Sequence, residues 1–337
     1  MVILRYRKGN STPNRQKGKK ELKGRCDLKK TRDANVYDAI MGVAVGDAFG
    51  FPYQFMPRGT FQVEEKMIAR AGRSGLPAGS WSDDTALTLA TIDSIVECKE
   101  IDVEDIMLNF ALWLVRGHFT PFGYAYDIGG GTMRSIENYI QGQDITTCGL
   151  RDFNANGNGS LMRILPLAFL PSTLDEIAAV SSLTHAHPIS VHACQIQIAV
   201  AKEIICGYDV LDAIERVMNR EPYNAYEEYA HLKNVQTMDR DEVSGSGYVL
   251  NTLTAALWCL TNTYNYHDCI IRAVNLGEDT DTVAAVAGGL AGLMYGIGGE
   301  RGVPTQWISA LQASRMVEDM CTDYEVCLDT VGRWWER

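Results

Sequence analysis

After residue 35, the apolar residues of this chain recur almost everywhere at three- and four-residue spacing. This spacing places apolar side chains on one face of an α-helix. It is clearest in VYDAIMGVAVGDAFG (36–50), DDTALTLATIDSIVE (83–97), VEDIMLNFALWLVRG (103–117), HPISVHACQIQIAVAKEIICG (187–207), SGYVLNTLTAALWCL (246–260), HDCIIRAVNLG (267–277) and DTVAAVAGGLAGLMYG (281–296). No pair of alternating apolar runs joined by Asn-Gly or Asp-Gly suggests a β-hairpin. The sequence therefore predicts an all-α fold, with one compact multi-helix domain over residues 35–337.

Small residues are frequent on these predicted helices, most clearly in AAVAGGLAGLMYG (284–296). A glycine inside a helix costs about 1 kcal/mol relative to alanine. Small side chains let helix backbones approach closely, so we expect these helices to pack tightly at the centre of the protein.

The first 33 residues differ in charge from the rest of the chain. They hold twelve Lys or Arg and three acids, which leaves nineteen basic and thirty-nine acidic residues in the remainder. Such a polar, charged segment cannot bury itself, so we expect residues 1–34 to form a basic, flexible arm. Three roles are open for the arm: a solvating extension, a protein-docking arm or a nucleic-acid-binding arm. Its single aromatic residue, Tyr6, argues against nucleic acid, because base stacking uses several aromatic side chains.

The nine cysteines are scattered and include no C-x-x-C pair. This pattern argues against a zinc site and against a disulfide framework. The sequence also lacks an apolar run of about 18 residues and the features of a secretory signal. We therefore expect a soluble, cytoplasmic protein without a membrane partner.

Two segments place hydroxyls and acids directly before an apolar helical run. They are WSDDTALTLA (81–90) and GEDTDTVAAV (277–286). Helix capping explains one oxygen and one acid in each segment, but not the surplus. If the two helix starts converge, their carboxylates cannot all stay ionised without cations. A ligand set made of oxygen favours two Mg²⁺ or Mn²⁺ ions over zinc.

Six motifs, in this order, resemble those of the ADP-ribosylglycohydrolase family. They are GVAVGDAFGFP (42–52), WSDDTAL (81–87), YDIGGGT (126–132), NGNGSLMRILPLAF (156–169), THAHP (184–188) and GEDTDTVAAVAGGLAG (277–292), and they span about residues 36–297. The resemblance implies an all-helical fold with a binuclear Mg²⁺ or Mn²⁺ centre at the base of a cleft. It also implies hydrolysis of the bond between ADP-ribose and a modified protein side chain, most often arginine.

The resemblance assigns roles to individual positions. The metal ligands it implies are Ser82, Asp83, Asp84, Asp279, Asp281 and Thr282, and the catalytic acids are Asp127, Asp84 and Asp281. The substrate contacts it implies are Asp127, Ile128, Gly129, Gly157, Asn158, Gly159, Ser160, Met162 and His187. Asp127 is expected to handle the attacking water.

One position departs from the family pattern. Family members commonly carry glutamate in a sequence like GAPVEF, whereas this chain has GFPYQF, with Gln54. An amide cannot act as a base. The change therefore favours Asp127 as the base.

Three functions stay open at this point. The first is removal of ADP-ribose from modified protein, with an added role in immunity if residues 1–33 dock on an ADP-ribosyltransferase toxin. The second is a protein-binding inhibitor with little catalysis. The third is a metal-dependent phosphohydrolase that uses the same oxygen cluster.

Overall fold

The computed structural model describes residues 35–70 and 75–336. The predicted basic arm, residues 1–34, lies outside the described residues. Within them the chain is helical, without strands, so the expected all-α class is confirmed. The α-helices are α1 (Val36–Gly50), α2 (Asp83–Cys98), α3 (Val103–Arg116), α4 (Gly130–Ile140), α5 (Leu174–Ser182), α6 (Pro188–Ile205), α7 (Val210–Met218), α8 (Val249–Thr261), α9 (Tyr266–Val274), α10 (Thr280–Tyr295), α11 (Thr305–Ala310) and α12 (Ser314–Val331).

Short 3₁₀ helices complete the fold. They are η1 (Phe51–Tyr53), η2 (Phe153–Ala155), η3 (Leu165–Phe169), η4 (Tyr223–Ala225), η5 (Glu227–Thr237), η6 (Arg240–Glu242) and η7 (Trp334–Glu336). The seven helices expected from apolar spacing are present as α1, α2, α3, α6, α8, α9 and α10, with small shifts of their ends. Helix α5 was not singled out by that spacing; it begins at a capping box formed by Thr173 and Glu176.

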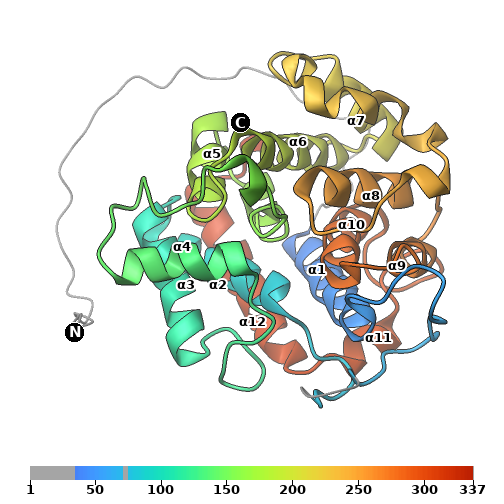
Figure 1. The fold of residues 1–337 in the computed structure, drawn as a ribbon, viewed down its shortest axis with the longest axis horizontal. Coiled ribbons are helices and arrows are strands. Elements are labelled where there is room, and N and C mark those ends of the chain that lie inside the picture. Colours follow the sequence, from blue (N-terminus) through green and yellow to red (C-terminus); the bar gives the residue numbers. More distant parts are fainter. Residues whose placement is uncertain (1–34, 71–74, 337) are drawn as a thin grey trace.

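Helices α1 and α10 lie side by side in the middle of the molecule (Figure 1). Gly42, Gly46 and Gly50 recur every four residues on α1 and face α10. A Cβ atom on these glycines would lie 2.3, 2.1 and 2.4 Å, respectively, from a backbone oxygen of α10. Only glycine permits so close an approach of the two backbones. The predicted tight packing at the centre is therefore present, and it involves α1 as well as the glycine-rich α10.

Two side chains donate hydrogen bonds to backbone carbonyls of α1, one from α9 and one from α10. The Tyr266 hydroxyl donates to the Gly42 carbonyl at 2.6 Å, and the Thr280 hydroxyl donates to the Gly50 carbonyl at 2.8 Å. The second bond ties the first residue of α10 to the last residue of α1. The acidic start of α10 is thereby fixed beside the end of α1.

Two further expectations concern cysteines and membranes. Cys98, Cys148, Cys194, Cys259, Cys269, Cys321 and Cys327 are free thiols. Among the described residues, no helix combines the length and the apolar character that a membrane crossing requires.

Candidate metal-binding active site

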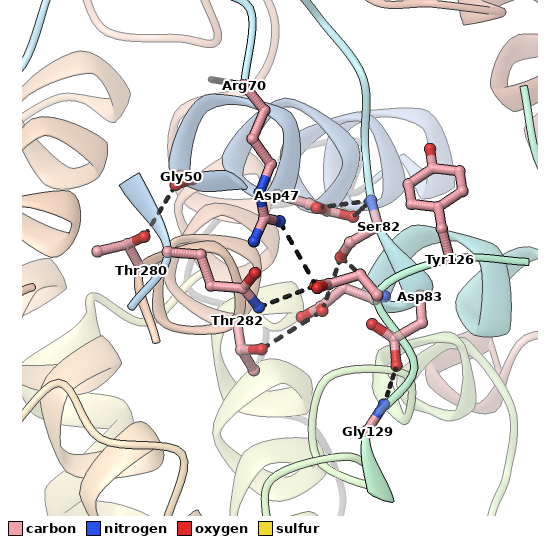
Figure 2. A network of polar contacts seen from close by, with 12 residues as sticks. Asp47, Gly50, Arg70, Ser82, Asp83, Tyr126, Gly129, Thr280 and Thr282 are labelled. Atoms are coloured by element: carbon pink, nitrogen blue, oxygen red, sulfur yellow. Dashed lines mark hydrogen bonds and ion pairs between the residues drawn. The ribbon is translucent and has the colours of Figure 1, made fainter. Parts of the chain in front are cut away.

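The N-terminus of α2 is held by an acid from α1. The Asp47 carboxylate accepts from the backbone N–H of Ser82 at 2.9 and 3.0 Å and from that of Thr85 at 3.0 Å. The Thr85 hydroxyl donates to the same carboxylate at 2.6 Å. Asp47 is fully buried and satisfies N–H groups that a helix start otherwise leaves unpaired. These bonds fix the direction of the acids on α2 (Figure 2).

The starts of α2 and α10 meet at Asp84. The Thr282 hydroxyl of α10 donates to Asp84 Oδ2 at 3.3 Å, and the Ser82 hydroxyl donates to the same oxygen at 3.0 Å. One carboxylate oxygen of Asp84 is therefore bound, while Oδ1 is buried without a hydrogen-bond partner among the described residues. The structure thus brings together the two acid-hydroxyl segments that the sequence pairs.

The buried acids form a cluster that fits a metal ion. One carboxylate oxygen each from Asp47, Asp84 and Asp281 lies within 4.8 Å of the others. Both oxygens of Asp281 are buried and lack hydrogen-bond partners in the part of the chain that the structure describes. A buried carboxylate without partners is costly, and a cation at this point would satisfy it. The all-oxygen donor set matches a hard divalent ion.

Burial and crowding both favour protonation of these acids when no cation is bound. Burial raises the pKa of Asp84 and Asp281 well above the usual value, and neighbouring carboxylates raise it further. Burial also raises the pKa of Asp83 well above its usual value, with Asp127 as the next largest cause. Burial raises the pKa of Asp47 to about 6, against the lowering effect of its hydrogen bonds from α2. A bound cation would keep these groups ionised.

Asp47 is the residue that sequence reasoning missed. It lies in an otherwise apolar helical segment, VAVGDAFG (43–50), and a lone acid in a helix that is buried all round was the available signal. Its oxygens lie in the acid cluster, but they already receive hydrogen bonds from α2. Its geometry suits an orienting residue as well as it suits a ligand.

Asp127 lies at the edge of the acid cluster, in a constrained loop. Its backbone is left-handed, with φ of +53°, a conformation that is uncommon for residues other than glycine. The Gln54 amide donates to Asp127 Oδ2 at 2.8 Å, and Arg70 Nη1 lies 3.6 Å from Oδ1. Asp127 is therefore oriented by the Gln54 amide, with the Arg70 guanidinium beside it, and its side chain is 16% exposed. Where the family commonly has glutamate, Gln54 therefore places a hydrogen-bond donor, and not a second carboxylate, beside Asp127, the expected base.

The next residues of this loop reach the acid cluster through their backbone. The Gly129 N–H lies 3.5 Å from Asp83 Oδ2, the long end of a hydrogen bond. Ile128 is half-buried, and Gly129 precedes α4 as its N-cap residue. These two predicted substrate positions therefore adjoin the acids, through Asp83.

The glycine-rich loop approaches the second acidic segment. The Asn158 amide donates to Asp279 Oδ2 at 2.6 Å and to the Thr252 hydroxyl at 3.0 Å. The Asn158 backbone N–H donates to the Gly247 carbonyl at 3.1 Å. Asn158 therefore orients Asp279, a link that its position in the sequence does not reveal.

The remaining predicted substrate positions differ in what their side chains reach. The Ser160 hydroxyl is buried and pairs with the Ser181 hydroxyl at 3.0 Å, and the Met162 side chain is also buried. Both residues are buried as a whole, so the structure does not present either of them to a substrate. His187 is half-buried and caps α6, since its Nδ1 accepts from the Ile189 N–H at 3.3 Å.

The buried ring of His185 packs against glycines of two segments, Gly131 in one and Gly157 and Gly159 in the other. His185 Nε2 lies 3.3 and 3.2 Å from where Cβ atoms on Gly157 and Gly131 would be, and its Cε1 lies 2.8 Å from that of Gly159. Burial lowers the pKa of His185 to about 3, so its ring is neutral. A Cβ atom at Gly159 would collide with the ring, and Cβ atoms at Gly157 and Gly131 would be tight against it, so packing alone favours glycine at these positions.

Comparison with known proteins agrees with this geometry. The model of the ADP-ribosylglycohydrolase family matches residues 28–333. The ADP-ribosylarginine hydrolase Tri1 of Pseudomonas putida (strain GB-1) is 32% identical, over 85% of this chain and 76% of its own length. The ADP-ribosyl-[dinitrogen reductase] glycohydrolase of Rhodospirillum rubrum is 31% identical, over 81% of this chain and 88% of its own.

A solved structure described as an ADP-ribosylglycohydrolase-related protein complex has a TM-score of 0.72 and 30% identity. The match covers 88% of this chain and 99% of that chain. The range matched by the family model includes the buried acids of α1, α2 and α10 and the glycine-rich segments at residues 129–131 and 157–159. The chain therefore belongs to the ADP-ribosylglycohydrolase family.

Proposed function

We propose that this protein hydrolyses the bond between C1 of ADP-ribose and a modified arginine side chain. The observation that carries the proposal is the meeting of α2 and α10, which leaves buried oxygens of Asp84 and Asp281 without partners. Relatives named for ADP-ribosylarginine hydrolysis support the choice of arginine.

The acids and hydroxyls at the two helix starts are the proposed metal ligands. They are Ser82, Asp83, Asp84, Asp279, Asp281 and Thr282, and we propose that they hold two Mg²⁺ or Mn²⁺ ions. When bound, the ions would supply Lewis acidity and would bind the vicinal ribose hydroxyls, which would orient C1 for attack. Asp47 orients α2, and Asn158 orients Asp279, so both act through other residues.

Asp127 is the proposed proton carrier. Cleavage of the C1–N bond passes through an oxocarbenium-like transition state. The leaving nitrogen takes the bonding electron pair, so the cationic substrate releases a neutral guanidine, and the water oxygen bonds to C1. Asp127 accepts the proton from that water and returns it to the guanidine. The Gln54 amide, which donates to Asp127 Oδ2, holds the carboxylate in position for both transfers.

The direct test measures release of free ADP-ribose by mass spectrometry. Purified protein with MgCl₂ is incubated with peptides that carry ADP-ribose on arginine or on serine. We expect release from the arginine peptide, and loss of release with chelator or with Asp281→Asn. Glu278→Gln is the matched control, because Glu278 is an exposed acid in the same segment. Full turnover by Asp281→Asn, or by the wild type in chelator, contradicts the proposal.

A role in immunity against an ADP-ribosyltransferase toxin is a separate part of the proposal. It depends on the charge of residues 1–33 alone, and these residues lie outside the described part. Deleting them should leave hydrolysis unchanged and remove binding to the transferase. Retained binding contradicts this role. Release of inorganic phosphate in place of ADP-ribose would favour the phosphohydrolase alternative.

A further inference from the structure

A guanidinium group of the chain itself occupies one side of the site. Arg70 extends toward the acids at the starts of α2 and α10 (Figure 2). Its Cζ atom lies 4.1 Å from the centroid of the Phe51 ring, and its Nη1 lies 3.6 Å from Asp127 Oδ1. Arg70 is thus placed over an aromatic face, with a carboxylate at its edge.

The surface beneath Arg70 is built from two separate parts of the chain. Phe51 begins η1 directly after α1, and its ring lies 6.0 Å from that of Tyr126. Asp127 follows Tyr126 and is held by the Gln54 amide. The Tyr126 hydroxyl in turn donates to the Trp81 carbonyl. The aromatic face and the carboxylate are therefore fixed independently of Arg70.

This pairing suits a guanidinium. A planar, weakly hydrated guanidinium stacks on an aromatic ring and presents N–H groups to a carboxylate in the same plane. An ammonium group is a compact, strongly hydrated charge and lacks the planar fork. The chemistry of the surface therefore selects arginine-like groups over lysine-like groups.

The contact of Arg70 with this surface is replaceable. At 3.6 Å its approach to Asp127 is longer than a charge-assisted hydrogen bond. The Arg70 backbone N–H donates to the Leu76 carbonyl at 3.2 Å, so the main chain is tied while the side-chain torsions can change. Among the described residues, the contacts that the guanidinium would give up on moving away are one ring contact and one loose ion pair, from a side chain that is 18% exposed.

We propose that Phe51 and Asp127 form the subsite for the guanidinium of the substrate, and that the Arg70 side chain fills this subsite until the substrate displaces it. The inference rests on the proposed function and deepens it, because it gives a reason for preferring arginine. A serine-linked ADP-ribose carries no cation at the corresponding atom and cannot replace Arg70 there.

The test uses agmatine as a guanidinium probe and butylamine as the matched amine probe, with binding measured by calorimetry on the full chain. Arg70→Ala should bind agmatine about 5- to 30-fold more tightly than the wild type, which is the range expected for one cation–π contact plus a loose ion pair. Butylamine binding should change little. Adding Phe51→Leu to Arg70→Ala should abolish the gain. Arg315→Ala, at an exposed arginine of α12, is the control and should match the wild type.

A kinetic readout separates this inference from the proposed reaction. Arg70→Ala should lower KM for an ADP-ribosylarginine peptide and leave kcat little changed. If the wild type hydrolyses that peptide but Arg70→Ala gains no affinity for agmatine, the subsite is wrong and the reaction stands. If agmatine binding behaves as expected without any hydrolysis, the subsite stands and the reaction is wrong.

Two further outcomes overturn the inference. If Arg70→Ala gains the same affinity for agmatine and for butylamine, the site attracts any cation and does not select a guanidinium. This comparison does not need the Phe51 variant, so it decides the question even if that variant does not fold. Loss of binding to free ADP-ribose in Arg70→Ala makes Arg70 an anchor for the diphosphate.

Discussion

The close contact of α1 and α10 makes Gly46 a critical position for both stability and activity. A Cβ atom on Gly46 would lie 2.1 Å from the Ala284 carbonyl oxygen and 2.7 Å from its carbonyl carbon. These are backbone atoms, so no side-chain rotation relieves the clash. The Gly46→Ala variant must therefore separate the helices by roughly 1 Å.

The separation of the helices lowers both the stability of the protein and the rate of the reaction. Overpacking of this kind costs about 1–3 kcal/mol, which lowers Tm by roughly 1.5–4.5 °C in a chain of this size. The effect on activity is larger, because the separation also moves two acids of the site apart. Asp47 lies one residue after Gly46 on α1, and Asp281 lies in the first turn of α10. A 1 Å error in the placement of reacting groups can cost about 100-fold in rate. We expect Gly46→Ala to keep its helical circular dichroism, to melt earlier and to lose most of its ADP-ribose release.

The assay pairs thermal melts with calorimetric titration of Mg²⁺. Gly130→Ala is the control for melting, because a Cβ at Gly130 meets no atom within 4 Å. It should not lower Tm. One result would refute the reasoning: a Gly46→Ala protein that melts within about 0.5 °C of the wild type, on a scale of about 1.5 °C per kcal/mol for this length, and turns over at the same rate.

Three other perturbations test the site. Gln54→Glu replaces the amide donor to Asp127 with a second carboxylate, so kcat/KM should fall by roughly 10- to 100-fold; an unchanged value would show that the amide does not position Asp127. Asn158→Ala removes the hydrogen bond at 2.6 Å to Asp279 and should weaken Mg²⁺ binding by about 10- to 100-fold in calorimetry, whereas unchanged binding contradicts the orienting role. In the metal-free protein, burial raises the Asp47 pKa to about 6, so the folded state favours the protonated carboxyl. This contribution to the free energy of unfolding is complete below about pH 4 and is lost as the pH rises to about 6, a loss of roughly 3 kcal/mol. Melts of chelated protein should therefore show a falling Tm over this range, and Mg²⁺ at pH 7 should reverse the loss; a rising Tm contradicts the sign.

Much of the fold could be predicted from local sequence, because a helix that buries one face needs apolar residues at three- and four-residue spacing. The apolar spacing marks α1 and α10 almost to the residue. The surplus of acids before α2 and α10 likewise predicts a shared site, since both segments exceed what capping explains. These features depend on neighbours three or four positions apart, so the chain displays them directly.

The contacts that complete the site join residues far apart in the chain. Asp47 meets Ser82 across 35 positions, and Gln54 meets Asp127 across 73. No local pattern encodes such pairs, because they arise only when α1 packs against α2 and α10. The guanidinium of Arg70 over Phe51 belongs to the same class, since loop geometry alone places it there.

Sequence by itself thus determined the all-helical class, the pairing of the two acid-hydroxyl segments and the family. Tertiary structure decided which carboxylates stay without hydrogen-bond partners, as in Asp281, and which are already bound, as in Asp47. The physical reason is that periodicity and capping act within one helix turn, whereas burial, hydrogen bonding and charge crowding depend on which helices meet.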